Sequence, residues 1–271
     1  MTKPARRLSD IACFLLDMDG TVYLGEKLLP GALDCLRQLQ QSGRDVLFLT
    51  NNSSRSADYY AQKLTRLGWP VSADAILTSG VATAAYLSSV KPRARVYLLG
   101  TPDLAAEFAR WQLVLTPQQP DYVVLGFDTT LTYEKLQLAC QLIRSGVPYI
   151  ATHPDINCPT ETGYIPDCGA MIALIRASTG IEPKIIGKPN REIIDAVFAR
   201  KPYSPAALAM VGDRLYTDIA AAATAGITGI LVLSGETGRE DLATACVRPD
   251  YVFAHLGELA AALRQSPAAG E

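Results

Sequence analysis

The segment ACFLLDMDGTVYLG, residues 12–25, carries an apolar run that ends in an acidic turn. Asp17 closes the run, Asp19 stands two positions later, and Gly20 comes next. Residues i and i+2 of an extended strand share one face, and a glycine marks the point where the chain turns. Both carboxylates can therefore face one pocket, one as metal ligand and nucleophile and the other as proton donor. Because an Asp-Gly pair is also common in plain hairpin turns, the segment needs support from the rest of the chain.

Later apolar runs also lead into a polar residue or a glycine turn. They are DVLFLT up to Thr50, KIIG before Lys188, ALAMVGD up to Asp213 and TGILVL up to Leu233. Amphipathic stretches such as 32–41 and 217–225 lie between the runs and predict helices. This alternation predicts an α/β fold with a mostly parallel sheet, in which polar residues at the strand ends meet along one edge.

A second set of elements lies in the middle of the chain. Its apolar runs begin near Arg95, Asp121 and Pro148, and its helical patterns cover about 133–144 and 169–179. These elements predict a smaller α/β domain inserted at 94–182. The remaining segments, 1–93 and 183–271, are predicted to form the core domain and to include the strand KIIG.

The composition is that of an ordinary globular protein. Hydrophobic residues make up 49% of the 271, charged residues 19%, and the net charge is −2, so there is no long-range attraction to nucleic acid or anionic lipid. The 6 cysteines form no CxxC pair, and 2 histidines are too few for a typical zinc site. The first apolar run is too short for a signal peptide or a membrane span. We therefore expect a cytoplasmic protein with reduced thiols and with neither nucleic acid nor membrane as a partner.

Candidate metal ligands follow a second strand. In GDRLYTD, Asp213 comes directly after an apolar run, and Asp218 stands five residues later at the start of a predicted helix. Acidic residues at two strand ends would repel each other unless a cation lay between them, and hard oxygen ligands of this kind suit Mg²⁺. Helix capping is the alternative role for Asp218.

Candidate phosphate ligands follow two other strands. TNNSS at 50–54 and GKP at 187–189 offer hydroxyl, backbone N–H and ammonium groups that can hold phosphate oxygens and offset their charge. Each motif alone is also typical of simpler structure, a helix cap for the first and a surface turn for the second. Their common position after apolar runs favours the phosphate role.

Taken in order, DMDGT, Thr50, Lys188 in GKP and GDRLYTD resemble the haloacid dehalogenase-like (HAD) superfamily over essentially the whole chain. The large insertion, LTNNS, ATHPD at 151–155 and the GKP form resemble the branch of NagD and the p-nitrophenyl phosphate, phosphoglycolate and pyridoxal phosphate phosphatases. The resemblance implies a Rossmann-like parallel-sheet core with an inserted α/β cap that governs specificity. It also implies a Mg²⁺-dependent phosphatase for a small phosphate ester, such as a sugar phosphate or nucleotide, and leaves open a homodimer formed through the cap.

Transferred to this sequence, the resemblance also implies roles for the acidic residues. Asp17 attacks phosphorus and forms an aspartyl-phosphate intermediate, while Asp19 protonates the leaving oxygen and later activates water. Asp17, the backbone carbonyl of Asp19, and Asp213 are the implied metal ligands. Asp218 matches an acidic position that acts through water or by orienting its neighbours.

For the phosphate and the substrate, the resemblance implies further contacts. Thr50 and Asn51 hold phosphate oxygens, and Lys188 binds phosphate while balancing the charge on Asp17. His153 departs from the asparagine of the related ATNPD motif, and it is either a substrate contact or, as we favour, a hydrogen-bonded turn residue. The remaining candidate substrate contacts are Asn52 and Asn157.

Other classes of function make different demands on the same segments. A nicotinamide-dependent oxidoreductase needs a glycine-rich first turn, and DMDGTV has no GxGxxG. A phosphate- or metal-binding module without turnover, or a phospho-accepting module, would keep the same residues. Asp19 favours turnover, because a phosphate acceptor has no need of a second carboxylate placed to protonate a leaving group.

Overall fold

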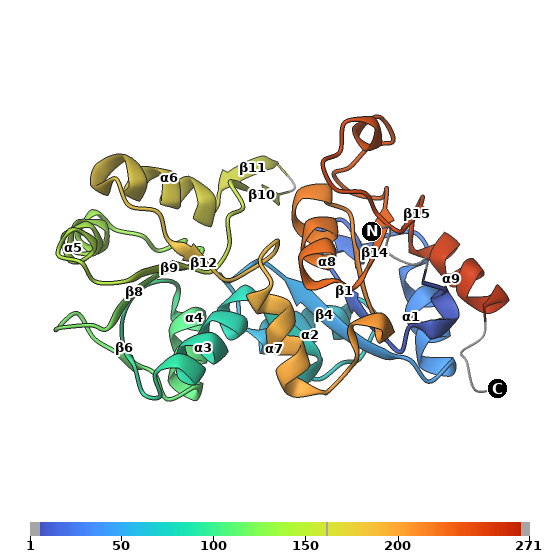
Figure 1. Ribbon diagram of the computed structural model, residues 1–271, viewed down its shortest axis with the longest axis horizontal. Helices are drawn as coiled ribbons and strands as arrows, with labels where there is room; N and C mark the ends of the chain where they lie inside the picture. The colour runs from blue at the N-terminus through green and yellow to red at the C-terminus, as the bar shows by residue number, and fades with distance from the viewer. Residues whose placement is uncertain (1–5, 161, 267–271) are drawn as a thin grey trace. The chain divides into compact units, whose positions relative to one another are not determined.

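The structure, a computed structural model, describes residues 6–160 and 162–266 and separates into two compact units. The first unit comprises the described residues of Met1–Thr50, Ala61–Ile76 and Val197–Glu271. The second comprises those of Asn51–Tyr60 and Leu77–Ala196. Each unit has its own sheet (Figure 1). The predicted α/β class with parallel sheets is confirmed, whereas the domain bounds at 94–182 stay a prediction.

The first unit is built on a six-stranded sheet with the strand order β15-β14-β13-β1-β4-β5. Its strands are β1 (Cys13–Leu16), β4 (Asp45–Thr50), β5 (Ile76–Thr78), β13 (Leu208–Gly212), β14 (Thr228–Val232) and β15 (Tyr251–Phe253). β1 pairs in parallel with β13 and β4, so that Leu16 lies opposite Val211 and Phe48. Every residue of β1, β13 and β14 is buried, as expected of parallel strands covered on both faces. The carboxyl ends of these strands therefore lead Asp17, Thr50 and Asp213 to the same edge of the sheet.

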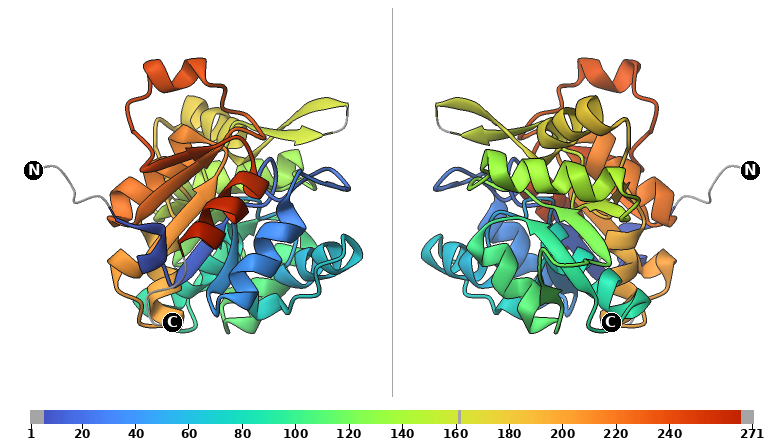
Figure 2. Two further views of the ribbon diagram at one scale, coloured as in Figure 1. Left: turned by 90° about the vertical axis from the view of Figure 1, so that its right-hand side faces the viewer. Right: turned by 90° about the vertical axis from the view of Figure 1, so that its left-hand side faces the viewer.

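Short elements complete the first unit. They are the hairpin β2 (Tyr23–Leu24) and β3 (Lys27–Leu28), with α1 (Ala32–Gln41), α8 (Ala220–Ala225) and α9 (Leu256–Gln265), while α2 (Ala57–Arg66) and α7 (Glu192–Arg200) each belong partly to both units. α1 buries Cys35, Leu36 and Leu39 at helical spacing and lies beside α9 (Figure 2, left). The helix predicted at 32–41 is confirmed. The one predicted at 217–225 opens instead as a π-type turn, Leu215–Ile219, before α8 begins.

The second unit contains a parallel sheet in the order β12-β9-β8-β6-β7. Its strands are β6 (Arg95–Leu99), β7 (Val114–Leu115), β8 (Tyr122–Leu125), β9 (Tyr149–Ala151) and β12 (Lys184–Ile185). β12 pairs with β9, whereas KIIG was predicted to belong with the core strands. A two-residue strand has an apolar pattern but nothing in it that selects its partner, which explains the difference. Both β9 and β12 lead at their carboxyl ends into candidate site residues, His153 and Lys188.

Helices with well-defined starts flank this second sheet. They are α3 (Ser79–Val90), α4 (Pro102–Arg110), α5 (Tyr133–Arg144) and α6 (Cys168–Thr179), and the hairpin β10 (Asn157–Thr160) with β11 (Gly163–Pro166) precedes α6. A threonine or aspartate side chain accepts a backbone N–H at the start of each helix: Thr78, Thr101, Thr132 and Asp167. α5 and α6 pack together on one side of the sheet (Figure 1). In the described ranges, every helix falls short of the length or apolar character that a membrane span needs.

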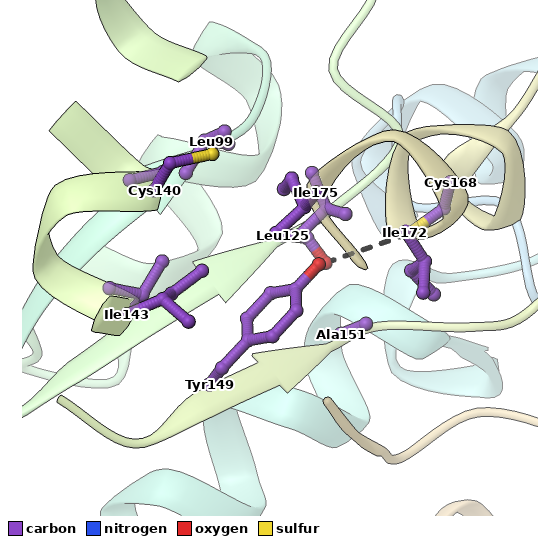
Figure 3. Packing of buried hydrophobic residues seen from close by; sticks show 11 residues of the cluster. Leu99, Leu125, Cys140, Ile143, Tyr149, Ala151, Cys168, Ile172 and Ile175 are labelled. Carbon is purple, nitrogen blue, oxygen red and sulfur yellow. Dashed lines mark hydrogen bonds between the residues drawn. The ribbon is translucent and has the colours of Figure 1, made fainter. Parts of the chain in front are cut away.

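The core of the second unit contains a buried phenol. Tyr149 projects from β9 among apolar side chains of β8, α5 and α6, including Leu125, Ile143 and Ile175 (Figure 3). Among the described residues its hydroxyl has no hydrogen-bond partner. A buried hydroxyl that lacks a partner destabilises the folded state, because it gives up its bonds to water on folding.

We therefore predict that Tyr149→Phe raises the free energy of unfolding by about 1 kcal/mol, since it removes the unpaired hydroxyl and keeps the ring. Urea unfolding followed by circular dichroism measures the change. Tyr97→Phe is the matched control: the Tyr97 hydroxyl donates to the carbonyl of Lys135 at 3.1 Å, so its removal should lower stability or leave it unchanged. Equal destabilisation of both variants would show that the Tyr149 hydroxyl does have a partner.

Candidate active site

The predicted site residues fall into two groups, one in each compact unit. The first unit holds Asp17, Asp19, Thr50, Asp213 and Asp218, and the second holds Asn51, Asn52, His153, Asn157 and Lys188.

A cluster of carboxylates forms the centre of the first group. Asp17 follows β1, with its N–H donating to the carbonyl of Val211 at 2.8 Å, and Asp213 follows β13. Carboxylate oxygens of Asp17, Asp213 and Asp218 lie within 4.8 Å of one another, with side chains 9%, 2% and 0% exposed. Buried like charges at this spacing repel, and oxygen donors gathered in this way are the ligand set of a hard divalent cation. These residues therefore fit a magnesium ion.

Asp218 belongs to the same cluster as Asp213. It lies in the π-type turn and accepts the N–H of Arg214, which precedes it in the chain, at 3.1 Å. A residue that caps a helix accepts N–H groups that follow it, so this is not the geometry of a simple N-cap. The sequence left Asp218 with either an indirect role, implied by the resemblance, or that of a helix cap.

The loop after β14 fixes the orientation of Asp213, a contribution that sequence reasoning missed. The N–H of Glu236 donates to Oδ2 of Asp213 at 2.7 Å, and the Thr21 hydroxyl approaches Oδ1 at 3.4 Å. A Cβ on Gly235 would lie 2.0 Å from Oδ2, so only glycine lets the loop come this close. The available signal was a glycine just past a buried strand, in the stretch SGE that follows TGILVL.

Asp19 and Thr50 complete the first group. The carboxylate of Asp19 is partly exposed and accepts from the hydroxyl of Tyr23 at 3.5 Å. Tyr23 is fully buried, and the Lys63 ammonium lies 3.9 Å from the centre of its ring. Thr50 is buried at the end of β4. Asp19 thus stands apart from the three-carboxylate cluster by its exposure, which suits a group that exchanges protons with a substrate.

In the second group, Asn51 and Lys188 are joined directly. The Asn51 carboxamide donates through Nδ2 to the Lys188 carbonyl at 3.0 Å and accepts the Lys188 N–H through Oδ1 at 2.9 Å. Nδ2 also donates to the Asp155 carboxylate, at 3.2 Å to Oδ1 and 3.4 Å to Oδ2. Lys188, Asn51 and Asp155 are all buried. Asp155 was not among the candidates, although it lies in the quoted ATHPD.

His153 lies in the interior, beside this pair. Its ring is fully buried, with Nε2 2.8 Å from Oδ1 of Asp167 and Nδ1 2.9 Å from the Thr152 hydroxyl and 3.3 Å from that of Ser79. Burial by itself lowers the pKa of His153, but the Asp167 carboxylate, with a further contribution from Asp155, outweighs it and raises the pKa above the usual value. Protein groups thus contact both ring nitrogens, in agreement with the favoured prediction of a hydrogen-bonded turn residue.

The two remaining asparagines occupy less enclosed positions. Oδ1 of Asn52 accepts the N–H of Ser54 at 2.9 Å and its hydroxyl at 2.7 Å, while Nδ2 lies 3.9 Å from the sulfur of Cys158. Asn157 begins β10 and is exposed. Asn157 lies at the base of the hairpin of β10 and β11, where it pairs with Pro166.

The His153–Asp167 pair makes stability depend on pH. We predict that His153→Ala lowers the free energy of unfolding by about 3 kcal/mol near pH 6, because it leaves Asp167 buried without its cation. As the folded-state pKa is raised, the contribution of the pair is complete below the unfolded value of about 6.5 and is lost as the pH rises through the higher folded value. Urea unfolding of wild type and variant across this range measures the difference.

Asp167→Asn is the control for this pH dependence, because asparagine still caps α6 but no longer holds the imidazolium charge. Its stability should show a much smaller change over the same range. A wild-type advantage over His153→Ala that grew with rising pH would contradict the assignment.

Family models match the segments that contain most of these residues. A family model described as haloacid dehalogenase-like hydrolase matches residues 14–113, and a second, described as HAD-hydrolase-like, matches residues 185–259. The first range contains DMDGT and TNNSS, and the second contains GKP and GDRLYTD.

Individual relatives match along nearly the whole chain. An acid sugar phosphatase of Staphylococcus saprophyticus is 35% identical over 93% of this chain and 98% of its own length. The crystal structure of a 4-nitrophenylphosphatase from Thermotoga maritima is 50% identical, with a TM-score of 0.91 over 94% of this chain and 98% of its own. A glycerol phosphate phosphatase of Mycobacterium tuberculosis, solved in complex with magnesium, is 36% identical, with a TM-score of 0.87 over 92% of this chain and 76% of its own. The predicted resemblance is confirmed: the chain belongs to the haloacid dehalogenase-like hydrolases, in the branch of NagD and the p-nitrophenyl phosphatases.

Proposed function

We propose that this chain is a magnesium-dependent phosphatase that hydrolyses small phosphate monoesters through an aspartyl phosphate on Asp17. Its family membership and its relatives make it a phosphoric monoester hydrolase. The observation that carries the proposal is the buried cluster of Asp17, Asp213 and Asp218 at the carboxyl ends of strands. Carboxylate oxygens gathered at a ligand-binding edge are the ligand set of a hard divalent cation, which would offset their mutual repulsion.

In the first step, a carboxylate oxygen of Asp17 attacks the phosphorus of the ester. A phosphorus–oxygen bond to Asp17 forms, and the bond from phosphorus to the ester oxygen breaks. The departing alkoxide takes a proton from the carboxyl group of Asp19, which leaves Asp19 ionised. The partial exposure of Asp19 favours this exchange with a substrate group.

In the second step, water attacks phosphorus and the bond to Asp17 breaks. The Asp19 carboxylate accepts a proton from the attacking water, so that both residues return to their starting states and inorganic phosphate is released. Splitting hydrolysis into two displacements lets one aspartate serve as acid and then as base. A phospho-accepting module would lack the second half of this cycle.

The other proposed residues bind the metal ion or the phosphate and offset the charges that meet there. Asp17, the backbone carbonyl of Asp19, and Asp213 would hold Mg²⁺, with Asp218 in the same cluster. The bound ion would offset the negative charge of the phosphate oxygens and so reduce their repulsion of the attacking Asp17 carboxylate. Thr50, the backbone N–H of Asn51 and Lys188 are proposed to act on the same phosphate, with Lys188 as the fixed cation.

The substrate class is proposed to be small phosphorylated alcohols. Named relatives are an acid sugar phosphatase, a glycerol phosphate phosphatase and a 4-nitrophenylphosphatase, and all these names describe phosphate esters of small hydroxyl compounds. Phosphate release from a panel of sugar phosphates, glycerol phosphate, nucleotides, phosphoglycolate and pyridoxal phosphate would rank the candidates.

For the nucleophile, we predict that Asp17→Asn lowers kcat for p-nitrophenyl phosphate to about 1% of wild type or less, because an amide does not form the acyl phosphate. The variant should remain folded, as thermal unfolding would show, because asparagine has nearly the same shape as aspartate. Asp34→Asn on α1, where the side chain is 70% exposed, is the matched control and should keep full activity. Substantial turnover by Asp17→Asn would exclude Asp17 as the nucleophile.

For the metal, we predict that EDTA abolishes activity and that excess Mg²⁺ restores it. Mg²⁺ alone, without substrate, should also raise the melting temperature, by an amount equivalent to about 2.7 kcal/mol at a concentration 100 times its Kd. Asp213→Asn should reduce this thermal shift, whereas Asp34→Asn should not. Activity that persists after complete chelation would rule out the metal.

A further inference from the structure

The hydrogen bonds of the Asn51 side chain leave little capacity for a ligand. A carboxamide has two N–H donors, and Nδ2 of Asn51 directs one to the Lys188 carbonyl and one to the Asp155 carboxylate. Oδ1 accepts the N–H of Lys188. A phosphate oxygen could reach this amide only by displacing one of these partners, and the bond to a carboxylate is the charge-assisted, stronger kind.

Further hydrogen bonds join the chain segments that contain Asn51, Thr152 and Gly187. The Ser79 hydroxyl donates to the carbonyl of Asn51, and the N–H of Gly187 donates to the carbonyl of Thr152 at 2.7 Å. A Cβ on Gly187 would lie 2.7 Å from Oδ1 of Asn51 and 2.5 Å from the Thr152 carbonyl oxygen. Glycine is therefore required for the chain before Lys188 to reach Asn51. The contacts join residue 51, the end of β9 and the turn after β12.

From this geometry we infer that the Asn51 carboxamide is a positioning group, anchored by Asp155, that fixes the main chain of Lys188 and does not itself bind the phosphate. Both the N–H and the carbonyl of Lys188 are held by one side chain, so the base of the lysine side chain has a fixed position. The inference deepens the proposed function, in which Lys188 acts on phosphate. It also assigns a positioning role to Asp155, although its carboxylate and the phosphate of the substrate are both negatively charged.

Exchanging the residues at 51 and 155 separates this role from direct phosphate binding. In Asn51→Asp alone, a carboxylate faces Asp155 and the Lys188 carbonyl, so two contacts become repulsive. In the double variant Asn51→Asp/Asp155→Asn, the amide at 155 can donate to the carboxylate at 51, which still accepts the Lys188 N–H. A single contact, the one to the Lys188 carbonyl, is lost.

We expect the double variant to recover at least about tenfold in kcat/KM for p-nitrophenyl phosphate over Asn51→Asp, with a parallel recovery in the Ki of inorganic phosphate. If the Asn51 amide bound phosphate directly, the anion at 51 would remain in the double variant. The two variants would then be equally impaired, and that result would overturn the inference.

Asp128→Asn is the matched control for the substitution at 155. Asp128 is a buried carboxylate of the same unit and pairs with Lys135 at 2.9 Å. Its loss should leave the Ki of phosphate within about twofold of wild type, while Asp155→Asn raises that Ki several-fold. An equal effect of the two variants would mean that the loss of any buried carboxylate of this unit weakens phosphate binding. That result would contradict a specific role for Asp155 as the anchor of Asn51.

Hydrogen exchange at the Lys188 peptide N–H tests the positioning without reference to activity. This N–H should be protected in the wild type and in the double variant, and should exchange at least about tenfold faster in Asn51→Ala, measured by NMR on protein whose fold is checked by thermal unfolding. Unchanged exchange in Asn51→Ala would refute the positioning role. Intact protection in a wild-type protein that does not hydrolyse p-nitrophenyl phosphate would instead refute the proposed function.

Discussion

The carboxylates of Asp17, Asp213 and Asp218 lie within 4.8 Å of one another and are almost fully buried, and this repulsion is the constraint on which the first unit depends. Charges in a protein interior are poorly screened, so the repulsion within such a cluster is strong and a bound cation would reduce it. The neighbouring backbone preserves the arrangement. The Glu236 N–H holds one oxygen of Asp213, and Gly235 has no side chain to displace it.

Much of this arrangement could be predicted from local sequence. Cys13–Leu16 and Leu208–Gly212 are uninterrupted apolar runs, and each is followed directly by an aspartate. Parallel pairing then brings both aspartates to one edge, because parallel strands run in the same direction. The burial of every residue in both strands agrees with the composition of the runs. Where a pattern is set by neighbours in the chain, the sequence is sufficient.

Other features depend on partners that are distant in the chain, and no local pattern encodes them. The two residues of β12 join β9 across more than thirty positions, and a short apolar run carries no information about which sheet it enters. The amide of Asn51 is bonded to groups 104 and 137 positions away, which its place after a strand does not indicate. Glu236 contributes to Asp213 through its backbone N–H, which every residue other than proline possesses, so the identity of its side chain gave no signal.

Each unit contains a close group of candidate metal ligands, and the two groups differ in composition and in their hydrogen-bond partners. His153, Asp155 and Asp167 satisfy the same 4.8 Å spacing as the cluster of Asp17, Asp213 and Asp218. In the second unit, however, the Asp155 carboxylate receives the Asn51 amide and Asp167 receives both the His153 ring and the Cys168 N–H. Hydrogen bonds from these donors join the two carboxylates to a network that fixes side chains. The same spacing therefore goes with different compositions: three carboxylates in the first unit, and two carboxylates with a histidine in the second, where Asp155 contacts the Asn51 amide that holds the main chain of Lys188.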